Sequence, residues 1–200
     1  NTEALVSHLV HRDSHSKTYL KVGGFAKQQN NFIDDTEIEV QKRRTAGYKA
    51  GIGYETIIGK TQWIGDVMYQ RGTGAFDAID PPEALFNEGS ARAGIVKVDL
   101  DVNQPIQVAD QALNYHASFK GQYATEALVP NDRLSIGGRY SVRGFDGERS
   151  LSGDHGATLR QELSAYIGDK PHAVYAGVDA GYVKLDNDDQ DDLLLGNHLV

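Results

Sequence analysis

The 200-residue sequence contains no cysteine, which excludes disulfide frameworks, thiolate zinc sites and cysteine nucleophiles. It also lacks any run of about eighteen consecutive apolar residues, so a membrane-spanning helix is excluded. A membrane β-barrel is not excluded, because its strands alternate polar and apolar residues and keep the mean hydropathy low. The mean hydropathy of -0.47 therefore leaves the membrane question open.

Positive charge is also scarce in this chain. Twenty Lys and Arg residues stand against 28 Asp and Glu residues, which gives a formal net charge of -8. The nearest approach to a basic cluster is Lys42-Arg43-Arg44. Nucleic-acid binding needs clustered lysine and arginine to neutralise phosphates, so we expect no nucleic-acid partner.

Signatures of enzyme and metal sites are incomplete. Gly51-Ile52-Gly53 lacks the third glycine of a dinucleotide fingerprint, and no serine lies in a Gly-x-Ser-x-Gly elbow. His8 and His11 are three residues apart on one predicted strand and therefore face opposite sides. The acidic run 186–192 lacks the glycine and the glutamate that a calcium loop requires. We therefore expect no enzymatic activity, no cofactor and no metal site.

Alternation of polar and apolar residues runs through most of the chain and predicts β-strands. The clearest case is 113–123, where the odd-numbered residues up to 119 are apolar and the even-numbered ones are polar. We expect about nine strands of roughly ten residues each, with the start of another at 193–200. The nine predicted strands cover 3–12, 18–28, 36–43, 48–58, 62–71, 91–102, 113–123, 157–167 and 174–183.

Strand length favours a membrane barrel over a soluble β-sandwich, whose strands usually have about five or six residues. Trp and Tyr near strand ends fit an aromatic girdle. Connections are short at 59–60 and 168–171 and long at 72–90 and 125–155, as at the periplasmic and external ends of outer-membrane barrels. The prediction is an all-β, antiparallel transmembrane β-barrel, with the soluble sandwich as the alternative.

The longest connection, about 125–155, contains the glycine-rich stretch 136–148. Its glycines allow sharp turns, while Val142 and Phe145 place apolar groups around the guanidinium of Arg143. Connections of this length are uncommon in compact domains and are usually functional or disordered. We therefore interpret this tip as a segment that inserts into the protein.

Several motifs in this chain resemble the haemolysin-activator family of two-partner secretion outer-membrane transporters (the TpsB family). The most specific are Ser141-Val142-Arg143-Gly144-Phe145-Asp146-Gly147, the segment 156–163, and Val178-Asp179-Ala180-Gly181. Weaker similarity at 7–13, 34–38 and 69–72 extends the resemblance over essentially the whole chain. It implies a barrel of about sixteen strands, preceded by two periplasmic POTRA domains and a plug helix. We expect 1–200 to be part of that barrel, a processed or excised piece without the POTRA domains and the first and last strands.

The resemblance also implies a site. In the family, an external loop folds into the barrel lumen and its tip arginine pairs with an inward-facing aspartate. The matching tip residues here are Val142, Arg143, Gly144 and Phe145. The matching partner is Asp179, which alternation independently places on the polar face of its strand. Arg160 and Glu162 face the same interior, and we expect them to extend the pair into a network.

The function implied by the resemblance is an outer-membrane pore of a Gram-negative bacterium. Such a pore secretes, with activation as a further role, a large partner exoprotein of the haemolysin, adhesin or contact-dependent toxin type. The other expected partners are outer-membrane lipid and lipopolysaccharide, and the barrel is expected to be monomeric. Two alternatives are an outer-membrane protein-assembly barrel of the same superfamily and a surface structural or adhesive barrel without translocation.

Overall fold

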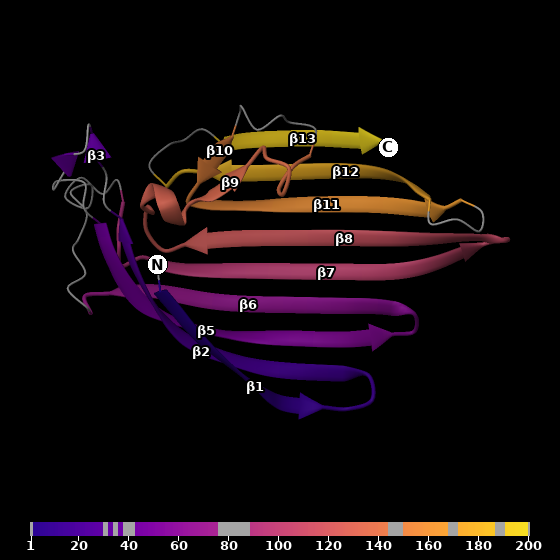
Figure 1. Cartoon of the computed structure of the whole chain (residues 1–200), viewed down its shortest axis with the longest axis horizontal. Coiled ribbons are helices and arrows are strands. Elements are labelled where there is room, and N and C mark those ends of the chain that lie inside the picture. The colour runs from indigo at the N-terminus through magenta and orange to yellow at the C-terminus, as the bar shows by residue number, and fades with distance from the viewer. Residues whose placement is uncertain are drawn as a thin grey trace.

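The computed structural model describes residues 2–29, 32–33, 36–37, 43–75, 89–143, 150–167, 172–186 and 191–199. Its main element is one antiparallel sheet of nine strands (Figure 1). In spatial order these are β1 (Thr2–Arg12), β2 (Ser16–Gln29), β5 (Arg43–Ile58), β6 (Thr61–Thr73), β7 (Gly94–Val108), β8 (Gln111–Ala124), β11 (His155–Tyr166), β12 (Ala173–Lys184) and β13 (Asp191–Leu199). Spatial order follows the chain, so successive strands of the sheet are neighbours, as in up-and-down barrels.

Strand lengths range from 9 residues in β13 to 16 residues in β5. About 9 to 11 tilted residues suffice to cross the hydrocarbon core of a bilayer. The predicted spanning length is therefore present throughout the sheet. Among the described residues, no helix is long and apolar enough to cross a membrane.

One predicted strand, 36–43, is not a strand of the main sheet. Its described part, β4 (Thr36–Glu37), pairs only with β3 (Phe32–Ile33), and 38–42 lie outside the described residues. The main sheet needs no strand there, because β2 pairs directly with β5 from Ser16↔Thr56 to Gln29↔Arg43. The ninth strand is instead β13, which begins at Asp191, two residues before the expected start.

Connections alternate in length along the sheet, as predicted. Short turns at Asp13–His15, Gly59–Lys60 and Ala109–Asp110 lie at one end, on the right in Figure 1. The predicted short connection 168–171 lies outside the described residues. The connection from β8 to β11 lies at the other end and contains a 3₁₀ helix (Pro130–Asp132), β9 (Leu134–Ile136) and β10 (Leu151–Gly153). We call this segment, residues 125–154, the long connection.

One face of the sheet is apolar and exposed. Val6 is 71% exposed, Val22 is 63% exposed and Val178 is 59% exposed, and Ile52 and Val67 are exposed as well. Apolar area on this scale is unfavourable in water and typical of contact with another protein or with lipid. An apolar solvent therefore suits this face, as expected for the outside of a membrane barrel.

The opposite face is polar and carries ion pairs between strands. Its acidic and basic residues pair as Lys17–Glu55, Lys21–Asp66, Lys49–Glu3, Lys120–Asp99 and His116–Asp101, the histidine being charged only when protonated. In each of these pairs the acidic and basic side chains neutralise one another, and a face with this many charged groups is unsuited to contact with lipid. The sheet is thus inverted relative to a soluble sandwich, whose covered face is apolar.

Aromatic residues on the apolar face gather at two levels. Near the long connections lie Tyr48, Tyr69, Tyr123 and Tyr182, and near the short turns lie Tyr54, Trp63 and Tyr115. The rings of Tyr48 and Tyr69 have centroids 6.3 Å apart. Two such levels match the aromatic girdles at the two interfaces of a bilayer.

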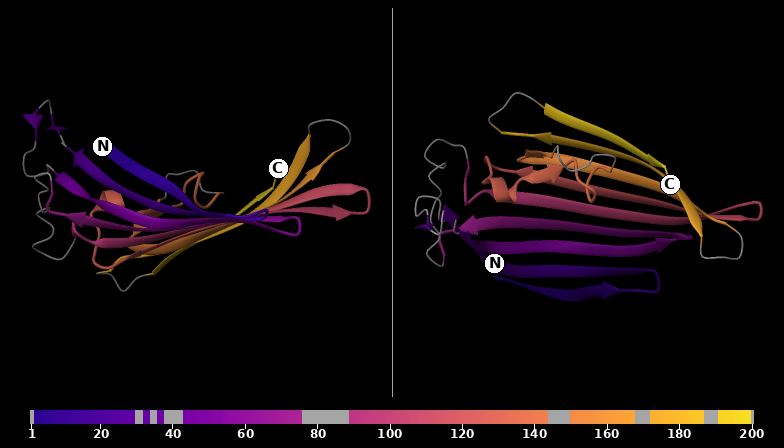
Figure 2. Two further views of the ribbon diagram at one scale, coloured as in Figure 1. Left: turned by 90° about the horizontal axis from the view of Figure 1, so that it is seen from below. Right: turned by 45° about the horizontal axis from the view of Figure 1, so that its top comes forward.

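The sheet is a twisted and curved layer, and the long connection lies over its polar face (Figure 2). Two small clusters of buried apolar residues form beneath this connection. One contains Ala93, Ile95, Ala124 and Leu128. The other contains Ile136, Val142 and Val183, with Leu134 and Leu151 packed against it. Both clusters lie where the long connection meets the polar face of the sheet.

Candidate functional site

The tip arginine lies against the polar face of β12. Arg143 donates from Nε to Asp179 Oδ2 at 2.7 Å and from Nη2 to Asp179 Oδ1 at 2.8 Å, which is bidentate geometry. The backbone N–H of Arg143 also donates to Asp179 Oδ2, at 2.8 Å. The side chain of Arg143 is 14% exposed and that of Asp179 is 2% exposed. The structure thus brings these two predicted site residues into direct, sheltered contact.

Glu162 and Arg160 lie beside this pair on the neighbouring strand β11. Arg143 Nη1 donates to Glu162 Oε2 at 2.6 Å. Arg160 Nε lies 3.9 Å from Asp179 Oδ2, and Arg160 Nη1 donates to the carbonyl oxygen of Tyr140 at 3.3 Å. We call the charge-balanced group of Arg143, Asp179, Arg160 and Glu162 the tip lock. Lysine would not reproduce the planar contacts that Arg143 makes with two carboxylates.

Two glycines on β12 make room for the tip. Gly177 and Gly181 flank Asp179 on the same face of the strand. A Cβ atom at Gly177 would lie 2.7 Å from Arg143 Nη2, and one at Gly181 would lie 2.6 Å from Val142 Cγ2. Both distances are shorter than any normal carbon contact. Because glycine has no side chain, these two positions leave a recess on β12 that receives the tip.

Val142 anchors the tip by apolar contact. It is fully buried and packs against Ile136 and Val183. Burial of a valine side chain stabilises this position by about 1.5–3 kcal/mol. The other two predicted tip residues, Gly144 and Phe145, lie outside the described residues.

The charge of the tip is fixed. Hydrogen bonding to the Asp179 carboxylate raises the pKa of the Arg143 guanidinium above its ordinary value, although burial acts in the opposite direction. Hydrogen bonding to Glu162 raises this pKa further. Deprotonation of arginine is therefore not a way to release the tip.

A second buried aspartate holds the base of the long connection. Asp154, 1% exposed at its side chain, accepts hydrogen bonds at Oδ1 from the Leu128 N–H at 2.9 Å and from Arg133 Nε at 3.1 Å. Its Oδ2 accepts from the Asp186 N–H at 2.9 Å. We call Asp154 and its three donors the base hub. Sequence analysis missed it, because two of the donors are backbone groups that leave no mark in the sequence.

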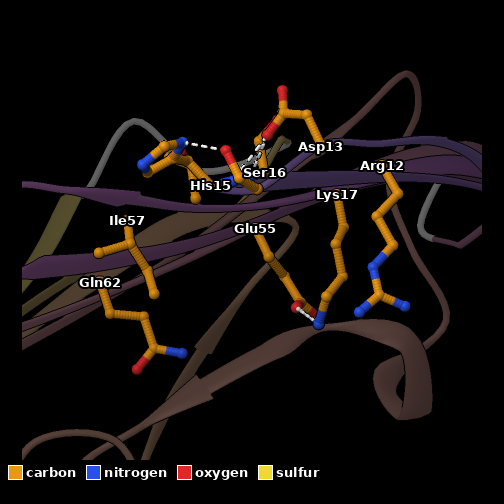
Figure 3. Close-up of a pocket in the computed structure, with 10 residues that line it drawn as sticks. Arg12, Asp13, His15, Ser16, Lys17, Glu55, Ile57 and Gln62 are labelled. Carbon is orange, nitrogen blue, oxygen red and sulfur yellow. Dashed lines mark hydrogen bonds and ion pairs between the residues drawn. The ribbon is translucent and has the colours of Figure 1, made fainter.

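A shallow polar pocket lies at the opposite end of the sheet, beside the turn between β1 and β2 (Figure 3). Lys17 Nζ lies 3.2 Å from Glu55 Oε2 there. In the adjoining turn, Asp13 accepts hydrogen bonds from the His15 N–H, the Ser16 hydroxyl and the Ser16 N–H, and these hold its pKa well below the ordinary value. Within the described ranges, no group of three His, Cys, Asp or Glu residues is arranged to hold a metal ion.

The geometry of the tip lock agrees with a family relationship that covers the whole chain. The model of the haemolysin secretion/activation proteins ShlB/FhaC/HecB matches residues 1–199. The chain belongs to this family. Its nine-stranded sheet is part of a transmembrane β-barrel of the outer membrane, as predicted, and we refer to the polar face of this sheet as the wall.

Curated relatives support the same assignment. The chain is 30% identical over 154 residues to the outer membrane transporter CdiB-2 of Burkholderia pseudomallei, which covers 77% of the chain and 26% of that protein. It is 26% identical over 139 residues to the hemolysin transporter protein HpmB of Proteus mirabilis, covering 69% and 25% of the two chains. The matched part of the chain thus spans about a quarter of the length of these relatives.

Solved structures of the family superimpose on the chain. CdiB from Acinetobacter baumannii matches with a TM-score of 0.85 at 34% identity, covering 98% of this chain and 34% of that one. CdiB from Escherichia coli matches with a TM-score of 0.87 at 24% identity, covering 98% and 37%, and shows the same fold. The open sheet therefore corresponds to about a third of a larger barrel protein.

Proposed function

We propose that the protein carrying this chain is an outer-membrane pore that secretes a large partner exoprotein by two-partner secretion. The observation that carries the proposal is the tip lock, in which Arg143 from the long connection is bound to Asp179 on the wall of the lumen. A loop fastened inside a pore controls the space through which a polypeptide passes. The relatives above are named as transporters, which favours secretion over barrel assembly or adhesion.

The locked state shapes the lumen for this role. Breaking a poorly hydrated ion pair by removing one partner leaves the other charge uncompensated, at a cost of about 3–5 kcal/mol. Contacts offered by a passing exoprotein replace those of Arg143, so the tip leaves the wall only while the exoprotein is present. The remaining polar wall suits an extended polypeptide, whose amide groups prefer a water-filled channel to lipid. Folding of the exoprotein outside the cell supplies the drive.

The finer partner assignments follow from the same surfaces. The exoprotein is of the haemolysin, adhesin or contact-dependent toxin type, and one relative is named as a hemolysin transporter. The apolar face contacts outer-membrane lipid, with lipopolysaccharide at the level of Tyr48, Tyr69 and Tyr123, and the barrel is monomeric. The long connection lies at the external end of the barrel and folds inward. POTRA domains and further strands lie in parts of the protein outside this chain.

Export by an Arg143→Ala variant of the full-length protein tests the proposal. We expect most of the exoprotein to be lost from the culture medium while the amount of folded transporter in the outer membrane stays the same. Arg139→Ala is the matched control, because Arg139 is an exposed arginine of the same connection and Arg143 is sheltered. Undiminished export by Arg143→Ala, or equal losses in both variants, would contradict the role of the tip lock.

A further inference from the structure

The long connection touches the wall at a second place, far from the tip lock. Lys27 Nζ donates to Asp132 Oδ1 at 2.6 Å. Lys27 belongs to β2, whereas Asp132 ends the 3₁₀ helix of the long connection. We call Lys27 and Asp132 the strap pair. The two residues are 105 positions apart in the sequence.

The strap pair reaches across much of the sheet. The long connection leaves β8, and β7, β6 and β5 lie between β8 and β2. Four steps of about 4.8 Å correspond to about 19 Å along the wall. Gln122 on β8 donates from Nε2 to the Asp132 carbonyl oxygen at 3.0 Å, and Lys97 on β7 interacts electrostatically with the Asp132 carboxylate. The 3₁₀ helix therefore lies over the lumen side of these strands and is held from both sides.

Lys27 is held in place on the wall. Its ammonium group lies 5.4 Å from the centroid of the Phe25 ring. The ammonium group of Lys49, on β5, lies 5.6 Å from the centroid of the same ring. Phe25 is buried and covers Gly47, where a Cβ atom would approach the ring to 2.8 Å. Lys27 is thus supported by a packed aromatic ring on the wall and is not a freely moving surface lysine.

The strap pair differs from the other lysine ion pairs of the lumen. Lys17–Glu55, Lys21–Asp66, Lys49–Glu3 and Lys120–Asp99 each join strands of the wall to one another. The strap pair joins the wall to the long connection, and its Asp132 side chain is only 13% exposed. Its position opposite the tip lock means that the long connection is fastened to β2 on one side and to β11 and β12 on the other.

We propose that Lys27 and Asp132 are positioning residues that hold the long connection across the lumen and must separate when the exoprotein passes. This inference rests on the proposed secretion function. Releasing the tip lock alone leaves the 3₁₀ helix tied to β2, so the passage stays obstructed on that side. Passage of a polypeptide requires the strap pair to part as well.

A covalent tie tests the need for separation. The chain has no cysteine, so Lys27→Cys and Asp132→Cys introduce the only thiols in this region of the full-length protein. After reaction with a short, reducible bifunctional thiol reagent, we expect export of the exoprotein to stop and to recover on reduction. The baseline is the same double-cysteine variant treated with a monofunctional thiol reagent, and export should fall below that baseline only with the bifunctional reagent. Continued export from a fully cross-linked population would overturn the proposal.

A charge exchange tests the pair by a second route, using the conductance of the purified full-length protein in planar bilayers. We expect Lys27→Glu to increase the frequency of large openings several-fold and the double exchange Lys27→Glu with Asp132→Lys to reduce it again. The matched control is Lys49→Glu with and without Glu3→Lys, which alters an ion pair within the wall. Lys27→Met, which removes the charge without repulsion, should open the pore less than Lys27→Glu.

The outcomes separate this inference from the proposed function. If Lys49→Glu opens the pore as much as Lys27→Glu does, the effect is one of luminal charge and the strap pair has no special role. If the unmodified protein itself exports no exoprotein, the secretion function fails instead. Migration of the folded barrel in unheated gels verifies that each variant is folded before its conductance is measured.

Discussion

The tip and the base of the long connection are each held by a buried aspartate, but the donors differ. Asp179 receives three hydrogen bonds from one residue, Arg143. Asp154 receives its three from Leu128 and Arg133 in the long connection and from Asp186, which follows β12. Movement of a single residue therefore releases the tip, whereas release of the base requires two segments of the chain to part from Asp154. Motion during secretion is therefore expected to begin at the tip and to reach the base hub, which adjoins Asp132, only later.

Asp179→Ala should produce the largest effect and should separate the behaviour of the tip from that of the base. It removes every acceptor that Asp179 offers to Arg143. Loss of one partner of a buried ion pair costs about 3–5 kcal/mol, and Glu162, which still accepts from Arg143, offsets part of this cost. We expect the tip to leave the wall while the base stays folded. Limited proteolysis of the full-length protein in detergent, with cleavage sites mapped by mass spectrometry, should show new cuts confined to 137–143. Cuts at 127–133 as well would mean that tip and base are one unit.

Asp154→Ala should produce the next largest effect, at the base. It leaves the buried N–H group of Leu128 without its acceptor, at a cost of roughly 1–3 kcal/mol, and also removes the acceptor of the exposed Asp186, at a smaller cost. We expect a lower thermal unfolding temperature and cleavage near 127–133, together with loss of export. Asp154→Asn keeps the shape and one acceptor oxygen, so it should fall between wild type and alanine. An unchanged unfolding temperature for Asp154→Ala would show that the base hub is not a support.

Gly181→Ala should have a smaller effect, confined to the tip. The added methyl group would lie 2.6 Å from Val142 Cγ2, and overpacking of this kind costs about 1–3 kcal/mol. Export should fall while the base remains resistant to protease. Gly65→Ala on β6 is the control, because its nearest neighbour would be at an ordinary 3.7 Å. Equal export by the two variants would show that the recess on β12 does not position the tip.

Asp13→Asn should produce the smallest effect, because the turn between β1 and β2 contacts neither the tip nor the base of the long connection. Hydrogen bonds from His15 and Ser16 lower the pKa of Asp13 in the folded protein. Their contribution is therefore complete above the unfolded-state pKa of about 3.9 and is lost as the pH falls through the folded-state pKa. Thermal unfolding of Asp13→Asn should depend slightly less on acidic pH than that of wild type. A large difference at neutral pH would show that this turn supports the whole sheet.

The sequence predicted the strands of the sheet better than the connection that lies over its polar face. Alternation has a period of two residues and is read locally, so it placed Asp179, Arg160 and Glu162 on the polar face and Val178 on the apolar one. The same pattern predicted a barrel strand at 36–43, whereas the described residues Thr36–Glu37 pair only with β3. Local pattern fixes which way a side chain points along a strand, but not which strands pair.

The contacts of the long connection could not be predicted from alternation of polar and apolar residues. Asp154 binds backbone groups, and the strap pair joins residues 105 positions apart, so neither leaves a periodic signal. The insertion of the Arg143 tip was predicted from its glycines and apolar neighbours, but its pairing with Asp179 was predicted only because the motif resembles that of a family. Gly177 and Gly181 did leave a signal, since glycines two residues on either side of an inward-facing aspartate mark a recess in the wall. A search for this spacing in other barrel strands would have identified them.

The tip lock balances its charges, with two guanidinium groups against two carboxylates. When the tip departs, it takes one positive charge with it and leaves Asp179 and Glu162 facing Arg160 alone. The vacated wall then has an excess negative charge. This negative charge attracts cations, so we expect the unlocked pore to prefer potassium over chloride more strongly than the resting pore does. Reversal potentials measured in a potassium chloride gradient would test this difference in selectivity.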